Sequence, residues 1–560
     1  NVAGFFGNGS ATGDITDAAA EFKRSIHALF IQDEWEPTAN LTVTAGLRYD
    51  FYESNDRPDA NALFEERFGF SNATGFDNFD VLQPRFGVNY DAPWSFYGQT
   101  SFRAGAGVFS GGDPTVFFSN AFSNSGNKIG FGSTAAPECD GFDTDSLVGP
   151  DGFAGVPECV RQQQQTEAQQ GDGRVDAIDP DLEVPSVIRA NFGFTHFTDF
   201  NNALGGFLDD WEMRVDVIHS RNRNSLDTID ISQAIDFRQG LDGFTRTGRP
   251  IRSSIDPAAE GCNADFIGAG QGYRNVTEEC FSFAASETTL LRNVDGGSAT
   301  SFTVNFLKRF EYEWFNKPGN FTFQMGYNFL DVNVVSEQAS STATGNLADT
   351  ASIDPQNKGV TTANSQVNHN IVISPQWRQD FISGLTTQWG LFFQARSGSP
   401  FSYVFDSDLF TPEDNQALFY VPTGLDDPNV DFSGMSAEDQ TALFEFIEQT
   451  GLDAFAGGVA PRNEFTGDWN LQLDLRFSQE LPGFFSGHRS FFFFDIQNLP
   501  NLISDDLSVF NNPSTRLQVV STGVNDQGQF TFQSFDGEEP DQFSTNASLW
   551  RIQFGIRYEF

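Results

Sequence analysis

The final stretch of the chain, SLWRIQFGIRYEF (548–560), alternates between apolar and polar side chains. The apolar set is Trp550, Ile552, Phe554, Ile556, Tyr558 and Phe560, and the polar residues between them are Arg551, Gln553, Arg557 and Glu559. A period of two is the period of a β-strand, whose successive side chains point to opposite faces. The segment therefore predicts a strand with one apolar and one polar face, ending on an aromatic residue.

The same period recurs along the chain, for example in NLTVTAGLRYDFY (40–52) and WNLQLDLRF (469–477). It predicts strands over 22–35, 40–54, 80–91, 99–111, 186–198, 209–222, 298–313, 319–334, 365–380, 385–398, 466–480, 489–499 and 546–560. Strands of soluble proteins usually have about 5 or 6 residues, whereas a tilted strand needs about 9 to 11 to cross a bilayer. The predicted lengths favour a membrane protein.

Short and long connections alternate between these strands. The short ones are EPTAN, APWSFYGQ, FNNALGGFLD, FNKPGN, DFISG and LPGFFSGHR, and the long ones lie near 55–79, 112–185, 223–297, 335–364, 399–465 and 500–545. Outer-membrane barrels have short periplasmic turns and long extracellular loops. The sequence therefore predicts an all-β, transmembrane antiparallel β-barrel in the bacterial outer membrane, with its long loops extracellular and its C-terminus periplasmic.

Composition agrees with this fold class. The 560 residues have a mean hydropathy of -0.35, and no apolar run approaches the roughly 18 residues of a membrane-spanning helix. Aromatic residues nevertheless make up 14%, with 63 Phe. No composition break or linker divides the chain, so we expect one domain over 1–560.

The net charge of -44, from 76 acidic and 32 basic residues, argues against nucleic acid as a partner, because phosphate binding requires a basic surface. It predicts a surface surrounded by cations. Adaptation of that surface to salt and a need for solubility are general explanations, and a specific cationic ligand is the alternative.

Several segments resemble TonB-dependent outer-membrane receptors. SIHALFIQDEWEPTANLTVTAGLRYDFY (25–52) is similar to a hairpin of that family, and FFFFDIQNLPNLISDD (491–506) resembles its penultimate strand. The last strand is similar too, and the resemblance identifies Trp550, Phe554, Ile556, Tyr558 and Phe560 as the signal read by the barrel-assembly machinery. ALFYVPTGLDDPNVDF (417–432) and GGVAPRNEFTGDWNLQLDLRFSQELP (457–482) resemble the Oar-like branch.

This resemblance implies a 22-stranded barrel around an N-terminal plug, preceded by a segment that binds TonB. The thirteen predicted strands would be the C-terminal part of such a barrel, which also explains their odd number. The first residues, NVAGFFGNGSATGD, include no start Met and no signal peptide. We therefore expect a fragment or a processed chain that lacks the plug and the first strands. The implied partners are outer-membrane lipid and lipopolysaccharide, the assembly machinery, TonB and an unknown extracellular ligand.

The four cysteines fall in two of the long connections, Cys139 and Cys159 in one and Cys262 and Cys280 in another. Extracellular loops are oxidising surroundings, and each pair is close in sequence, so we predict two local disulfides. CxxC-type spacing, which a zinc site would require, is absent.

Two features of the long connections suggest local structure. SAEDQTALFEFIEQTG (436–451) predicts a helix with Ser436 as N-cap, Asp439 in a capping box and Gly451 as its end, packed on neighbouring loops through Leu443, Phe444, Phe446 and Ile447. GDGRVDAIDPDLE offers Asp172, Asp176, Asp179, Asp181 and Glu183 as calcium ligands, although their spacing departs from an EF-hand. A solvated loop is the simpler interpretation, and DDPNVD, with Asp426, Asp427 and Asp431, is a further candidate. No other cofactor is predicted.

Nothing in the sequence predicts an enzyme. The five histidines, His27, His196, His219, His369 and His488, occur singly, and neither HExxH nor GxSxG occurs. Polar strand residues, Arg48, Asp50, Arg214, Asp216, Asp474 and Arg476, are expected to hydrate a channel wall or contact a plug. Three functions remain: a plug-gated receptor of the Oar-like type, a porin-like passive channel, and a surface adhesion or assembly protein anchored by its barrel.

Overall fold

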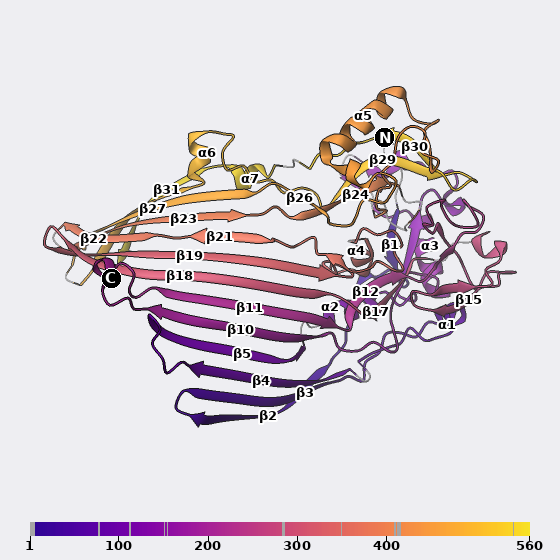
Figure 1. Ribbon diagram of the computed structural model, residues 1–560. Helices are drawn as coiled ribbons and strands as arrows, with labels where there is room; N and C mark the ends of the chain where they lie inside the picture. Colours follow the sequence, from indigo (N-terminus) through magenta and orange to yellow (C-terminus); the bar gives the residue numbers. More distant parts are fainter. Residues whose placement is uncertain are drawn as a thin grey trace.

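The computed structural model describes residues 6–560 except 77–78, 111–113, 150–151, 154, 283–285, 349, 383, 408–409, 411–415, 486 and 541–542. Its largest element is a 15-stranded sheet, which we call the wall. Figure 1 shows the long wall strands side by side, with most of the other elements gathered at one end. No helix in the described ranges is long and apolar enough to span a membrane.

The wall strands follow one antiparallel path in chain order. They are β2 (Ser25–Thr38), β3 (Leu41–Glu53), β4 (Asp80–Asp91), β5 (Gly98–Ser110), β10 (Ser186–Thr198), β11 (Glu212–Arg223), β18 (Ser298–Trp314), β19 (Lys317–Val334), β21 (His369–Ile373), β23 (Leu385–Arg396), β27 (Asn470–Pro482), β28 (Arg489–Gln497) and β31 (Arg551–Glu559). β20 (Thr361–Thr362) and β22 (Gln376–Ile382) complete the sheet. Every predicted strand is present, close to its predicted bounds.

Some boundaries differ from the prediction. The single strand expected over 365–380 is divided into β21 and β22 at Ser374 and Pro375, because proline has no N–H to donate to the sheet. The first strand begins at Ser25 rather than at residue 22, and the last begins at Arg551 because Thr545–Ser548 forms helix α7. Within the described ranges, β2 pairs only with β3 and β31 only with β28, so the wall is an open sheet.

The register places the predicted apolar residues in continuous rows across the strands. Phe194 lies opposite Val215, Val215 opposite Val304, and Val304 opposite Tyr327. Directly opposed residues of antiparallel strands share one face of the sheet. One face of the wall is therefore apolar, and the alternate residues form a polar face. The short turns and the adjoining end of β22 carry exposed aromatic side chains, as expected at a membrane interface; they are Trp94, Phe96, Phe207, Phe315, Phe381, Phe484 and Phe485.

The long connections fold together at the other end of the strands into a unit that we call the cap (Figure 1). Its sheets are β12 (Ser225–Asp230), β17 (Thr288–Val294) and β9 (Val175–Ile178); β25 (Val430–Asp431), β30 (Phe530–Phe535), β29 (Arg516–Val524), β24 (Pro400–Asp406) and β26 (Phe465–Thr466); and the pairs β1 (Phe6–Ser10) with β6 (Ile129–Ser133), β7 (Val148–Gly149) with β8 (Gly152–Phe153), β13 (Gln233–Ile235) with β14 (Arg252–Ser254), and β15 (Asp265–Gly268) with β16 (Gly272–Arg274). The cap is folded rather than a set of separate loops.

Short helices complete these connections. The α-helices are α1 (Ala62–Phe68), α2 (Thr115–Ser123), α3 (Glu158–Gln170), α4 (Ala343–Ala348), α5 (Ala437–Thr450), α6 (Leu499–Ile503) and α7 (Thr545–Ser548). The 3-10 helices are η1 (Ile15–Ala18), η2 (Pro137–Cys139), η3 (Thr144–Leu147), η4 (Ala203–Gly206), η5 (Glu278–Ser282) and η6 (Leu452–Phe455).

The largest hydrophobic core of the molecule lies in the cap. Phe401, Tyr403 and Phe405 of β24, Leu517 of β29 and Phe530 of β30 are almost completely buried there. Burial of such side chains contributes about 1.5 to 3 kcal/mol each. The cap is thus stabilised by its own interior.

The predicted helix is part of this core. In α5, Ser436 accepts a hydrogen bond from the Asp439 N–H at 3.1 Å, and Gly451 ends the helix in the left-handed conformation. Leu443, Phe446 and Ile447 are buried, and Phe444 is partly buried against the core. The predicted start, end and packing of this helix are confirmed.

Candidate functional site

Ion pairs lie on the polar face of the wall, some within one strand and one reaching from β5 across β10 to β11. The Arg103 guanidinium donates to both carboxylate oxygens of Asp216 at 2.5 Å, and also to the Thr195 hydroxyl at 3.1 Å. Arg48 donates to Asp50 at 2.8 Å, and the same carboxylate accepts from Gln83 at 2.7 Å. These contacts satisfy charged groups within the sheet and leave a hydrogen-bonding surface.

The other predicted polar residues lie on the same face. Arg214 pairs with Glu212 at 3.3 Å, and Arg476 lies 3.6 Å from Asp495. Asp474 accepts hydrogen bonds from Gln472 at 2.8 Å and from the Asn498 N–H at 2.9 Å. The six residues lie as three pairs on β3, β11 and β27, and the structure does not bring the three pairs together into one site.

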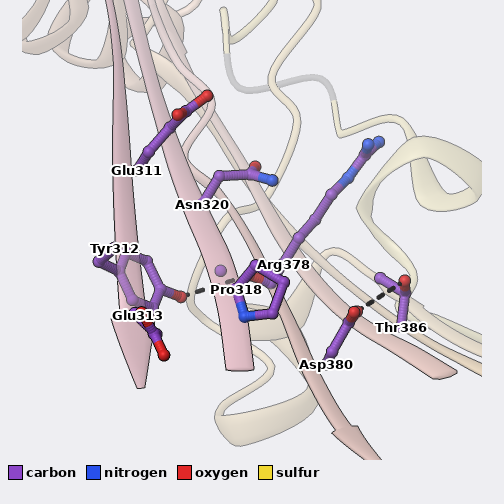
Figure 2. A pocket seen from close by; sticks show the side chains of 9 residues that line it. Glu311, Tyr312, Glu313, Pro318, Asn320, Arg378, Asp380 and Thr386 are labelled. Carbon is purple, nitrogen blue, oxygen red and sulfur yellow. Dashed lines mark hydrogen bonds between the residues drawn. The ribbon is translucent and has the colours of Figure 1, made fainter. Parts of the chain in front are cut away.

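A cavity lies toward the short-turn end of the wall, among β18, β19, β22 and β23 (Figure 2). Its volume is about 880 Å³, and its lining includes Glu311, Glu313, Asp380, Asn320 and Arg378. Glu311 lies opposite Asn320, which lies opposite Arg378, so these side chains share the polar face. The cavity combines three carboxylates with one guanidinium and suits a hydrated polar solute.

Two hydrogen bonds hold the margins of this cavity. The Tyr312 hydroxyl donates to the Arg378 carbonyl oxygen at 3.3 Å, and the Thr386 hydroxyl donates to Asp380 at 3.0 Å (Figure 2). A second cavity, of about 260 Å³, borders Asp474, Arg476 and Asp495 on the same face. The polar face therefore offers two separate hollows.

Buried lysine and arginine side chains link separate segments of the cap. Asp227 is fully buried between Lys358, at 2.8 Å, and Arg292, at 2.9 Å. Burial lowers the pKa of Lys358, and the attraction of Asp227 opposes that effect. A buried carboxylate is tolerated here because two cations neutralise it.

Arg249 is completely buried, and among the residues that the structure describes no carboxylate is in hydrogen-bonding contact with it. Its guanidinium donates to the carbonyl oxygens of Ile353, Leu418 and Ser352 at 3.1, 2.8 and 2.7 Å, and it lies 4.7 Å from the Phe410 ring centre. Burial lowers the pKa of Arg249 to about 9. This one side chain joins three segments of the cap.

Arg462 acts in the same way. It donates to the carbonyl oxygens of Val334, Val335, Ala351 and Gly359 at 3.0 to 3.4 Å, and burial lowers its pKa to about 10. Sequence reasoning missed Arg249, Lys358 and Arg462, because nothing in their local sequence distinguishes a buried cation from an exposed one. The cavity residue Arg378 was missed for a related reason, since its neighbours come from separate strands.

Both predicted disulfides are present. Cys139 is bonded to Cys159 and Cys262 to Cys280, and the described residues include no free cysteine. Each bond closes a short segment within one cap connection. The cap is therefore covalently restrained at two places.

Four of the five predicted calcium ligands, Asp172, Asp176, Asp179 and Glu183, have protein partners. Asp172 pairs with Arg67 at 2.7 Å, and Asp176 is buried and accepts from Arg174, Asn124 and Thr289. Asp179 accepts from the N–H of Asp181 at 2.9 Å, and Glu183 accepts from Asn224 at 2.7 Å. No group of three or more His, Cys, Asp or Glu side chains in the described ranges is arranged to hold a metal ion.

The interpretation of this stretch as a solvated loop is wrong for Val175–Ile178. These residues form β9, and all four are buried. The other acidic candidate, DDPNVD, also has internal contacts. Asp427 is buried and accepts from the N–H groups of Thr423 and Asn429, both at 2.8 Å.

The five histidines lie apart from one another, in or beside separate wall strands, and each contacts neighbouring side chains. His196 contacts Thr100, His219 contacts Thr300, and His369 contacts Tyr327, at 2.8 to 2.9 Å. His27 lies 3.2 Å from Glu53, and His488 lies 2.7 Å from Tyr558. They are separate contacts between strands rather than a paired acid and base.

The proposed assembly signal lies in and beside β31. Phe554 and Ile556 are 74% and 73% exposed, as is expected for side chains that face lipid, and Phe560 is 97% exposed. Trp550 immediately precedes the strand, and Tyr558 contacts His488. The structure gives their positions on the apolar face, and their role in assembly stays a prediction.

Comparison with known proteins identifies a family. The family model described as "Outer membrane beta barrel domain" matches residues 2–537. No curated protein matches the sequence.

Two solved structures give distant matches. The outer-membrane transporter YddB of Escherichia coli aligns at 11% identity and a TM-score of 0.41, covering 91% of this chain and 44% of YddB. The ferric enterobactin receptor PfeA of Pseudomonas aeruginosa aligns at 7% identity and a TM-score of 0.27, covering 96% of this chain and 60% of PfeA. The chain thus spans about half the length of these proteins.

Proposed function

This chain belongs to the outer membrane beta barrel domain family, and we propose that it forms the barrel part of a gated transport protein, a TonB-dependent receptor of the Oar-like branch. Membership places it in the bacterial outer membrane and in a family that is generally non-enzymatic. In the proposed function, the cap captures an extracellular ligand, and the polar face of the wall lines its route across the membrane.

One observation carries this proposal: a single sheet has a continuous apolar face, an ion-paired polar face with two cavities, and a folded cap at one end. A barrel strand in lipid presents alternating apolar and polar residues to the bilayer and to the lumen. The polar face therefore suits a water-filled or plug-filled lumen.

The open wall supports further strands that close the barrel. The free edges of β2 and β31 would leave backbone N–H and C=O groups without partners, at a cost of several kcal/mol for each group in lipid. We propose that these strands bring the total to the 22 that the family resemblance implies. A plug would then occupy the lumen and couple the barrel to TonB.

The cap supports capture by a preformed surface. Arg249 and Arg462 fix cap segments that are more than a hundred residues apart in the sequence. A rigid binding surface loses less conformational entropy when a ligand binds.

Intact mass and N-terminal sequencing of the protein extracted from outer membranes test the proposed extent of the chain. The proposal predicts a longer polypeptide with a plug and further strands before Asn1. A mature protein that begins near Asn1 would contradict it.

Planar-bilayer conductance tests the gated lumen. The full-length protein is expected to remain closed, and a variant without its plug is expected to conduct. In that open variant, Arg378→Glu should increase cation selectivity, whereas the control Arg309→Gln, also on the polar face but outside the cavity, should change it less. Stable conductance of the untreated full-length protein would favour the passive channel instead.

A second candidate function is that of a surface adhesion or assembly protein, which the barrel would anchor in the membrane. The separate hydrophobic core of the cap favours this candidate. It predicts that cells lose attachment but keep solute uptake when cap residues are changed. Uptake and attachment measured on the same cap variants separate the two functions.

A further inference from the structure

Two arginines flank a glycine on the polar face of the wall, toward its cap end. The register places Arg85 of β4 opposite Gly107 of β5, and Gly107 opposite Arg189 of β10. Directly opposed residues share one face of an antiparallel sheet, so both arginines lie on the face of Arg103 and Asp216. Gly107 has no side chain, so the space between the two arginine side chains is left open at the level of the backbone.

Both guanidiniums lie beside one aromatic ring. The guanidinium carbon of Arg85 lies 4.7 Å from the centre of the Phe109 ring, and that of Arg189 lies 5.8 Å from it. Arg85 also donates to the Gln83 side-chain oxygen at 2.9 Å, and Arg189 donates to the Ser220 hydroxyl at 3.0 Å. A guanidinium is attracted to an aromatic ring at such distances. The two cations are therefore positioned by neighbouring side chains and are close enough for one ligand to contact both.

The charges of these two arginines are not neutralised by the protein. Arg85 and Arg189 are exposed, and within the described ranges neither contacts a carboxylate. The Asp50 carboxylate lies beyond Gln83, whose amide donates to Asp50 at 2.7 Å and accepts from Arg85, and Asp50 is already paired with Arg48. A guanidinium has five N–H donors. Each of the two therefore keeps donors for a ligand.

A smaller cavity adjoins Arg85 on the side of β2 and β3. Its volume is about 120 Å³, and its lining includes Phe30, Gly46, Arg48 and Arg85. Gly46 lies opposite Arg85, and Phe30 lies opposite Arg48, so these residues share the polar face. The Phe30 side chain is nevertheless 74% exposed there. An exposed ring next to guanidiniums suits a ligand that has both an apolar part and an anionic group.

We propose that Arg85 and Arg189 bind the oxyanion group, a carboxylate or a phosphate, of a small ligand that enters the lumen from the cap. Guanidinium binds both groups through two parallel hydrogen bonds. In a chain of net charge -44, most of the surface repels anions, so this pair is a local position that attracts them. Phe30 would contact the apolar part of the same ligand. This inference rests on the proposed function, because it requires the polar face to line a lumen, and it gives the ligand a chemical class.

Ligand-observed fluorine NMR on the full-length protein in nanodiscs tests this site. The probes are para-fluorobenzoate and para-fluorophenyl phosphate, and the neutral para-fluorobenzyl alcohol is the control ligand. At least one anionic probe should bind the original protein more tightly than the alcohol does. Arg85→Gln/Arg189→Gln should bind that probe about tenfold more weakly, because hydrogen bonds to a charged group are lost. The control Arg309→Gln, on the polar face of β18 opposite Thr322, should leave the dissociation constant unchanged.

The same dissociation constant in all three proteins, or an equal loss in the control, would overturn the proposal. Absence of saturable binding to the full-length protein would also overturn it, since a plug would then cover the two arginines. Retained mobility shift on heating in detergent gels verifies that each variant has a folded barrel. A wall without a lumen is detected separately, as absence of conductance in the plug-free variant, so failure of the proposed function is distinguishable from loss of the anion site.

Discussion

The wall and the cap shield their apolar side chains from water in opposite ways. In the wall, Val215, Val304 and Tyr327 form apolar rows that are only partly covered by the protein, so lipid must complete their surroundings. In the cap, Phe405, Phe419 and Phe530 pack against one another, and the protein supplies its own interior. The wall therefore depends on its solvent, whereas the cap depends on contacts between distant segments.

The same difference governs charged residues. On the polar face of the wall, pairs such as Arg103–Asp216 are partly exposed to the lumen side, with both side chains about 30% exposed. In the cap, Asp227 and Lys358 are fully buried. Removal of a charge should therefore lower the free energy of unfolding more in the cap than on the polar face of the wall.

Replacing Asp227 with Asn should have the largest effect. The change leaves Lys358 and Arg292 buried without a counter-charge, and loss of one partner of a buried pair costs about 3 to 5 kcal/mol. Hydrogen exchange should increase in β12 and β17 and remain unchanged in β18 and β19. The exposed control Asp295→Asn should leave both regions unaffected, and equal loosening of the wall would contradict the separation of the two regions.

Introducing a charge on the apolar face should destabilise the wall by a smaller amount. Val304→Arg places a guanidinium between Val215 and Tyr327 near the middle of the strand, where lipid exposure costs about 2 to 4 kcal/mol. Thr303→Arg, on the polar face beside Asp216, is the matched control and should cost less than about 1 kcal/mol. Denaturant titration of the folded barrel in vesicles measures both, and equal costs would show that the two faces are not distinguished.

Removal of one cap disulfide should weaken the cap alone. Cys262→Ser/Cys280→Ser removes a disulfide between residues 18 apart in the sequence. On the chain-entropy model such a bond contributes about 3 kcal/mol to the free energy of unfolding, and less where the unfolded chain keeps native contacts. Protease cleavage within 255–282 should become faster while β10 and β11 stay protected. Unchanged cleavage would mean that the hydrophobic core restrains this segment without the bond.

Acidification should lower the stability of the cap through protonation of Asp236. Burial opposes ionisation of Asp236, but hydrogen bonds from Arg238, Gln239 and Ser253 outweigh it and lower the pKa of Asp236 to about 2. Since the folded pKa lies below the ordinary value, the stabilisation is present above about pH 4 and is lost as the pH falls toward 2. The contribution is about 1 to 2 kcal/mol.

Stability of the cap measured from pH 6 to pH 2 checks this effect. Asp236→Asn should be less stable than the original protein at pH 6 and should lose less stability on acidification. Identical pH profiles for the two proteins would assign the acid sensitivity to other carboxylates.

The wall strands could be predicted because the alternation that marks each strand lies within one short segment of the sequence. The alternation in 548–560 and 469–477 is sufficient to locate β31 and β27, and the lengths of the connections predict their direction. The division at Pro375 follows from a missing N–H, which the period alone does not reveal. Helix α5 was also predictable, because Ser436 and Gly451 mark its ends within a few residues.

The cap and the cavity could not be predicted in the same way. Arg249 binds carbonyl groups 103 to 169 residues away, and Asp227 is separated from Lys358 by 131 residues. The cavity joins Glu311, Asn320 and Arg378 through the registers of three strands. Such contacts depend on the assembled tertiary structure and leave no periodic signal in the chain.

The central claim is that the wall separates lipid from a lumen. Measuring how accessibility alternates along β27 tests it most directly. Single spin labels at 471 to 478, in the full-length protein in lipid vesicles, are probed with oxygen, which enters lipid, and with a water-soluble nickel complex. Labels at Leu471, Leu473, Leu475 and Phe477 should favour oxygen, and those at Gln472, Asp474, Arg476 and Ser478 should favour the nickel complex or be protected from both by a plug. Equal exposure to water on both sets would contradict a wall that separates lipid from a lumen.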